Sequence, residues 1–164
     1  LTELLDFVRP QKLNVKSVRL NEIMESSLQA FCAEFEKKNI TIAKTFCSAI
    51  PLLDIDTDQF KRVLQNLFHN AMEAMPQGGV LNVTTELDPG WVKISIADTG
   101  VGISDDDIEK VFHPFFSSKS SGSGLGLAVC NQIISIHGGH IKLSRQIPYG
   151  VIFDIFLPVA GSDS

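Results

Sequence analysis

The most regular pattern in this sequence is a run of apolar residues at helical spacing that begins after Asp56. One continuous apolar face is formed by Phe60, Val63, Leu64, Leu67, Phe68, Ala71, Met72 and Met75. The Asp56 carboxylate can cap the start of this helix, Gln59 follows it as in a capping box, and the Pro and Gly residues in 76–79 end it. This helix is the clearest element of the sequence, and the fold has to accommodate its single apolar face.

Shorter patterns on both sides of this helix predict the remaining elements. A helix capped by Asn21 is expected to end near Asn39, and the 88–90 turn is expected to join two strands as a hairpin. A last helix should run over 124–136 with Gly138 as its C-cap. We expect strands at 15–18, 40–46, 52–55, 80–87, 91–97, 140–143 and 151–157. This order implies an α/β sandwich of two layers, with a mixed sheet of about five strands and helices on one face.

Composition restricts the kind of protein this is. The chain has 164 residues, of which 44% are hydrophobic, which suits one globular domain with its own core. A formal charge of −5, with no run of Lys or Arg, argues against a nucleic-acid partner. The three cysteines lack metal-ligand spacing, and no apolar run reaches the roughly 18 residues of a membrane span. We therefore expect a soluble cytoplasmic domain.

Polar residues follow one edge of the apolar face of the 57–75 helix. Asn66, Asn70 and Glu73 stand at i, i+4 and i+7, which places them at the boundary of the core. A solvated polar flank is one explanation. Asparagine is a poor helix former, however, and a side-chain amide oxygen that ligates Mg²⁺ is another explanation for two aligned asparagines.

Asp98 ends an alternating strand and shares the parity of its buried residues Val92, Ile94 and Ile96. A buried carboxylate needs a hydrogen-bond donor, either from the protein or from a ligand. Directly after it, the 99–103 stretch has two glycines, which allow backbone to approach a flat ligand closely.

A glycine-rich run, 121–127, leads into the last predicted helix. Backbone N–H groups at a helix N-terminus, with no bulky side chains beside them, can bind phosphate. The spacing is neither the dinucleotide fingerprint nor a P-loop, so another phosphate-binding architecture is needed. The preceding residues, 99–123, show no clear periodicity, and a stretch of about 25 such residues in a compact domain is usually a functional lid.

Together these motifs resemble the catalytic domain of bacterial sensor histidine kinases, in the wider family of gyrase, heat-shock and mismatch-repair ATPases. The resemblance covers about 14–158 and is nearest to nitrogen-regulation type kinases. Residues 65–71 resemble the asparagine box, 98–103 the first glycine box, 111–119 the phenylalanine box and 122–127 the second glycine box. The resemblance implies a Bergerat-type fold with a flexible ATP lid over about 99–123.

The resemblance also implies roles for single residues. Asn70 would coordinate Mg²⁺ at the ATP phosphates with Asn66 assisting, Asp98 would accept the adenine amino group, and Lys119 would contact the terminal phosphates. Asn66, Asn70 and Lys119 are thus the expected catalytic residues, and Phe115 with Phe116 would anchor the lid. The expected nucleotide contacts are Asn66, Asn70, Glu73, Ala74, Asp98, Gly100, Gly102, Ile103, Phe116, Lys119, Gly122, Ser123, Gly124, Leu125, Gly126 and Leu127.

Three activities fit a chain that resembles this family. The first is phosphoryl transfer from Mg-ATP to a histidine on a separate dimerisation domain, and then to a response-regulator aspartate. The second is hydrolysis, but the ATPases of the family place a glutamate where Asn66 stands, and that glutamate orients the attacking water. The third is an anti-sigma-type serine kinase, against which the phenylalanine box argues.

The resemblance divides the chain into three parts. Residues 1–13 resemble the end of the second helix of a dimerisation domain and a linker, 14–158 the catalytic domain, and 159–164 a tail. None of the four histidines lies in a phosphoacceptor motif, so we expect no self-phosphorylation. His69 and His113 are expected on the surface, and His137 and His140 in structural roles. The expected partners are the chain's own dimerisation domain and a receiver domain, in a monomeric fragment of a homodimeric protein that is cytoplasmic or anchored to a membrane.

Overall fold

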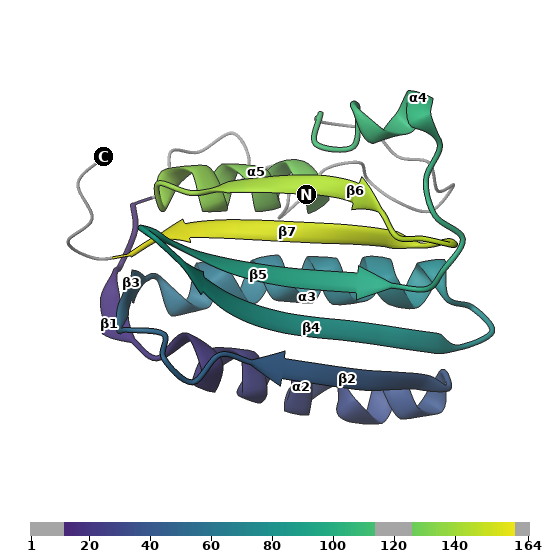
Figure 1. Ribbon diagram of the computed structural model, residues 1–164, viewed down its shortest axis with the longest axis horizontal. Coiled ribbons are helices and arrows are strands. Elements are labelled where there is room, and N and C mark those ends of the chain that lie inside the picture. The colour runs from purple at the N-terminus through teal and green to yellow at the C-terminus, as the bar shows by residue number, and fades with distance from the viewer. Residues whose placement is uncertain (1–11, 114–125, 160–164) are drawn as a thin grey trace.

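A computed structural model describes residues 12–113 and 126–159 of the chain. Within these residues, helices α2, α3 and α5 lie together on one face of a five-stranded sheet (Figure 1). The strands are β1 Lys16–Val18, β2 Ile40–Phe46, β3 Leu53–Ile55, β4 Gly79–Asp88, β5 Trp91–Asp98, β6 His140–Arg145 and β7 Val151–Pro158. The helices are α2 Leu20–Lys37, α3 Thr57–Ala74, α4 Asp105–Ile108 and α5 Gly126–Ile136. The predicted two-layer α/β sandwich is confirmed.

The large sheet is mixed, as its order β2-β4-β5-β7-β6 shows. β2 runs parallel to β4, and the other neighbouring pairs are antiparallel. The predicted hairpin joins β4 to β5 with Asp88 opposite Trp91, and Gly90 has the positive φ of +78° that such a turn requires. β1 and β3 form a separate antiparallel pair.

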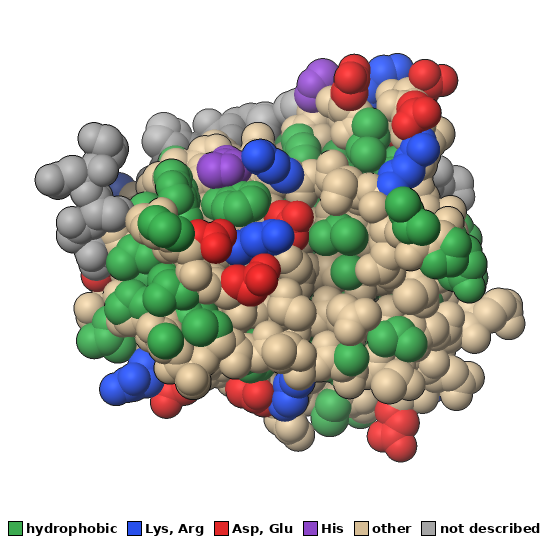
Figure 2. All heavy atoms as spheres, viewed as in Figure 1, with side chains coloured by type: hydrophobic (Ala, Val, Ile, Leu, Met, Phe, Trp, Pro, Cys, Tyr) green, Lys and Arg blue, Asp and Glu red, His purple; other side chains and the backbone are tan. Residues whose placement is uncertain are grey.

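The two faces of the sheet differ in chemistry because successive side chains alternate between them. Val83, Ile94 and Ile155 are fully buried against the helices. On the other face, charged and histidine side chains gather over the strands (Figure 2). There the His140 ring stacks on Phe156 with 4.6 Å between ring centroids. The core therefore lies between the sheet and the helices.

The start of α2 differs from the prediction. The N-cap is Arg19, whose side chain makes no capping hydrogen bond, and Asn21 lies inside the helix. Asn21 Nδ2 donates to the Cys47 carbonyl oxygen (2.7 Å), and its Oδ1 accepts from Thr85 Oγ1 (3.0 Å). The Asn21 side chain could have capped the helix, but it is hydrogen-bonded to residues of other segments instead. No local sequence pattern reveals these partners.

The segment after β5 also differs, because 99–123 was predicted to lack regular structure and α4 forms within it. Ser104 caps α4 by accepting from the Asp107 backbone N–H (3.2 Å), and acidic residues fill its first turn. This helix is too short for its periodicity to show in the sequence. Arg145 of β6 forms an ion pair with Asp105.

Asp56 joins the start of α3 to two distant segments. Its carboxylate is buried and accepts from the backbone N–H groups of Gln59 (3.2 Å) and Asn14 (2.8 Å). Its own N–H donates to His137 Nε2 (3.0 Å), and the other ring nitrogen of His137 lies 2.8 Å from the Ile133 carbonyl oxygen. The predicted cap is confirmed, and His137 has the structural role expected of it.

Replacing Asp56 by alanine is expected to lower the free energy of unfolding by about 2 kcal/mol. The change removes an N-cap and leaves buried N–H groups without their acceptor. Urea denaturation measures the loss. Asp58→Ala is the matched control, because Asp58 is an exposed acidic residue in the first turn of the same helix and should cost less than about 1 kcal/mol. Equal losses in the two variants would contradict the role of the cap.

Candidate functional site

One side of α3 carries the polar residues that the sequence singled out. Asn66, Asn70 and Ala74 are half-buried and Glu73 is exposed, so the two asparagines lie at the core boundary as predicted. Asn66 Nδ2 donates to the Arg62 carbonyl oxygen (3.1 Å). A Cβ atom built on Gly126 would lie 3.0 Å from Asn66 Oδ1, so this amide lies directly against the first residue of α5.

Asp98 is buried at the end of β5, with 4% of its surface exposed. Its Oδ1 accepts from the Gly100 N–H (2.9 Å) and, at longer range, from the Val151 N–H (3.4 Å). The prediction of a buried carboxylate with a hydrogen-bond donor is confirmed for protein donors. Because these two donors reach the same oxygen, they hold the plane of the carboxylate in a fixed orientation.

The segment after Asp98 connects the end of β5 to the end of α3. A Cβ atom on Gly100 would lie 2.3 Å from the Ala74 carbonyl oxygen, so only glycine fits there. That same carbonyl accepts from the Val101 N–H (3.0 Å). Gly102 has a φ of +79°, which favours glycine, and Ile103 packs partly buried against the core.

The structure therefore brings many of the predicted site residues together along α3. Asn66 lies beside Gly126 at the start of α5, and Ala74 lies beside Gly100, two residues after Asp98. Asn70 is one helical turn from both Asn66 and Ala74, on the same side of the helix. Leu127 is half-buried against the core. The predicted residues Phe115, Phe116, Lys119, Gly122, Ser123, Gly124 and Leu125 lie outside the described residues, as do 1–11 and 160–164.

Two residues beside Asp98 were missed by the sequence analysis. Gln146 Nε2 donates to the Asp98 carbonyl oxygen (2.6 Å), and a Cβ atom on Gly150 would lie 2.0 Å from that oxygen. Both belong to the connection between β6 and β7. In the sequence, only Gly150 could have indicated a close backbone contact at this point. Gln146 gave no indication, because it is 48 residues from Asp98 in sequence.

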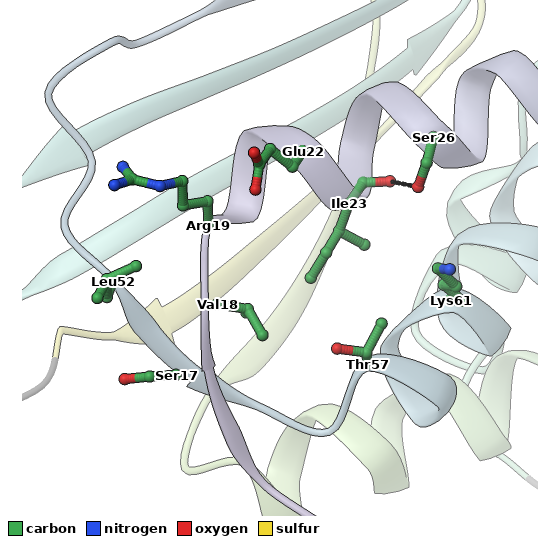
Figure 3. A pocket seen from close by; sticks show the side chains of 9 residues that line it. All are labelled: Ser17, Val18, Arg19, Glu22, Ile23, Ser26, Leu52, Thr57 and Lys61. Carbon is green, nitrogen blue, oxygen red and sulfur yellow. Dashed lines mark hydrogen bonds between the residues drawn. The ribbon is translucent and has the colours of Figure 1, made fainter.

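A separate hollow of about 440 Å³ lies between β1, the start of α2 and the start of α3. Val18 and Ile23 point toward its centre, while Arg19 and Lys61 lie on opposite sides (Figure 3). None of the residues predicted to contact nucleotide lines it. It lies at the Thr57 end of α3, away from the Asn70 to Ala74 end.

Two kinds of feature are absent from the described residues. Among these residues, no group of three or more His, Cys, Asp and Glu side chains is arranged to hold a metal ion. No helix in 12–113 or 126–159 combines the length and apolar character needed to span a membrane. His69 and His113 are exposed, as predicted, and the ring of His69 meets Phe31 edge-on with 5.3 Å between centroids.

Comparison with known proteins identifies the family. The model of the histidine kinase-, DNA gyrase B- and HSP90-like ATPases matches residues 55–161. A crystal form of the catalytic domain of histidine kinase ThkA is 32% identical, with a TM-score of 0.83 over 90% of this chain and 97% of that chain. This chain is a histidine kinase catalytic domain.

Some relatives are much longer than this chain. Sensor histidine kinase ZraS of Escherichia coli (strain K12) is 38% identical over 97% of this chain, which spans 34% of the length of ZraS. Histidine kinase ThkA in complex with response regulator protein TrrA is 29% identical, with a TM-score of 0.85 over 97% of this chain and 46% of that one. The resemblance to sensor histidine kinases is confirmed, and the likeness to the nitrogen-regulation type stays a prediction.

Proposed function

We propose that this catalytic domain binds Mg-ATP and donates the γ-phosphate to a histidine on a separate dimerisation domain, for onward transfer to a response-regulator aspartate. The proposal rests mainly on the buried Asp98 carboxylate. This carboxylate accepts from the Gly100 N–H, and Gly100 lies against Ala74, which is on the side of α3 that carries Asn70. A carboxylate oriented by protein N–H groups suits the exocyclic amino group of adenine.

The side chains along α3 suit the phosphate end of the nucleotide. Asn70 offers an amide oxygen, a hard donor of the kind that Mg²⁺ accepts, and the metal would neutralise charge on the phosphates. Gly126 begins α5 without a side chain, and backbone N–H groups at a helix N-terminus can bind an anion such as a phosphate group. Glu73 and Ala74 would lie beside the nucleotide, and Lys119, Phe116 and the 122–125 run would complete its site.

Transfer is favoured over hydrolysis by Asn66. An amide has no basic atom with which to activate water, and its Nδ2 already donates to the Arg62 carbonyl oxygen. The γ-phosphate is thereby retained for a nucleophile from another domain. ThkA, which has been solved in complex with a response regulator, supports a receiver domain as the final acceptor for this protein too.

Radiolabelled Mg-ATP tests this proposal. We expect no label on the 164-residue chain alone, because none of its four histidines lies in a phosphoacceptor motif. Adding a partner dimerisation domain with an inactivated catalytic domain should give acid-labile phosphate on that partner. Label on the isolated chain, or none on any dimerisation domain of its own protein, would contradict the proposal.

A further inference from the structure

Asp98 is the last residue of β5 and pairs with Leu81 of β4 on one side. On the other side, the last pair of the β5–β7 ladder is Ala97 opposite Ile152. Just beyond that pair, Gln146 Nε2 donates to the Asp98 carbonyl oxygen at 2.6 Å. The half-buried Gln146 side chain thus extends the sheet by one hydrogen bond, at the residue that carries the buried carboxylate.

The rest of the β6–β7 connection holds Gln146 in this position. The Gln146 N–H donates to the Gly150 carbonyl oxygen (3.0 Å), which closes the connection on itself. Gly150 is buried with a φ of +110°, and its missing side chain allows contact with the Asp98 backbone. The next residue, Val151, contributes the N–H that lies 3.4 Å from Asp98 Oδ1. One connection therefore contacts Asp98 at both its carbonyl group and its carboxylate.

We propose that Gln146 is a positioning residue for the Asp98 carboxylate and thereby determines selectivity for a purine with a 6-amino group. The inference rests on the proposed function, in which Asp98 accepts that amino group. A small displacement of an acceptor weakens a directional hydrogen bond strongly, and a site built around such a bond discriminates against ligands that lack the group. If Gln146 had only a structural role, its replacement would instead change the affinity for every nucleotide equally.

The test compares ATP with purine riboside triphosphate, which lacks the 6-amino group. Gln146→Glu keeps the shape of the side chain but sets an acceptor against the Asp98 carbonyl, and should weaken ATP binding about tenfold. Gln146→Met, which has no charge, should weaken it by a smaller factor. Both variants should bind the purine analogue as the unmodified chain does. Tyr149→Ala is the control, because Tyr149 is an exposed residue of the same connection and its loss should leave both affinities unchanged.

A double-mutant cycle completes the test, with dissociation constants measured by calorimetry. In an Asp98→Ala background, neither Gln146 variant should reduce ATP affinity further. Equal losses for ATP and the purine analogue, or a further loss in that background, would overturn the positioning role. If Asp98→Ala weakens ATP binding while both Gln146 variants bind ATP normally, this inference alone fails. If Asp98→Ala has no effect, the proposed function fails with it.

Discussion

Replacing Asp98 by alanine is expected to weaken ATP binding by about 10- to 150-fold, since a hydrogen bond to a charged group contributes roughly 1.5–3 kcal/mol. The carboxylate is buried, and N–H groups from two different segments hold its orientation. Removing it would take away the proposed acceptor for the adenine amino group and the acceptor of the Gly100 N–H. Titration of the chain with ATP in the presence of Mg²⁺ measures the change.

Two further variants separate binding from folding in this experiment. Asp98→Asn retains an oxygen that can accept from the Gly100 N–H but loses the negative charge, so it should fold and still bind ATP weakly. Asp88→Ala removes an exposed carboxylate at the hairpin end of β4 and should leave ATP affinity unchanged. Unaltered affinity in Asp98→Ala, with unfolding curves that confirm a folded chain, would rule out Asp98 as the adenine acceptor.

Much of the fold could be predicted because it depends on local chemistry. The apolar face of α3, its Asp56 cap and the turn at Gly90 each follow from a few neighbouring residues. The burial of Asp98 was predictable for the same reason, because strand side chains alternate and Asp98 shares the parity of Ile96. Family motifs then supplied roles for residues that pattern alone left open.

What could not be predicted depends on contacts between segments far apart in the chain. Asn21 has the chemistry of a helix cap, yet it bonds to Cys47 and Thr85, which only the folded sheet brings near. Gln146 lies in a connection without periodicity, and its hydrogen bond to the Asp98 carbonyl oxygen becomes apparent only in the folded structure. The spacing of residue types and their secondary-structure propensities do not reveal such hydrogen bonds between distant segments.

In the proposed function, the arrangement along α3 would bring nucleotide and metal together. Asn66 lies beside Gly126 at the start of α5, and Ala74 lies beside Gly100 at the end of β5. Asn70 is between them on the same helix, so the expected metal ligand would be fixed relative to both the proposed phosphate end and the proposed base end of the nucleotide. Replacing Asn70 should therefore weaken the part of ATP binding that depends on the metal and leave the contacts with adenine unchanged.

Replacing Asn70 by alanine is accordingly expected to reduce Mg²⁺-dependent ATP binding by at least about tenfold, with little change in binding measured in excess chelator. Changes to residues that only support a metal ligand cost about 10- to 100-fold in metal affinity, and a direct ligand should cost no less. Calorimetric titrations with and without Mg²⁺ give two ratios, each being the dissociation constant of the variant divided by that of the unmodified chain in one condition. Asn82→Ala is the matched control, because Asn82 is an exposed asparagine of β4 and should change neither ratio. If Asn70→Ala lost the same factor in both conditions, its amide would serve the helix or the nucleotide, and the metal would have to be held by other groups.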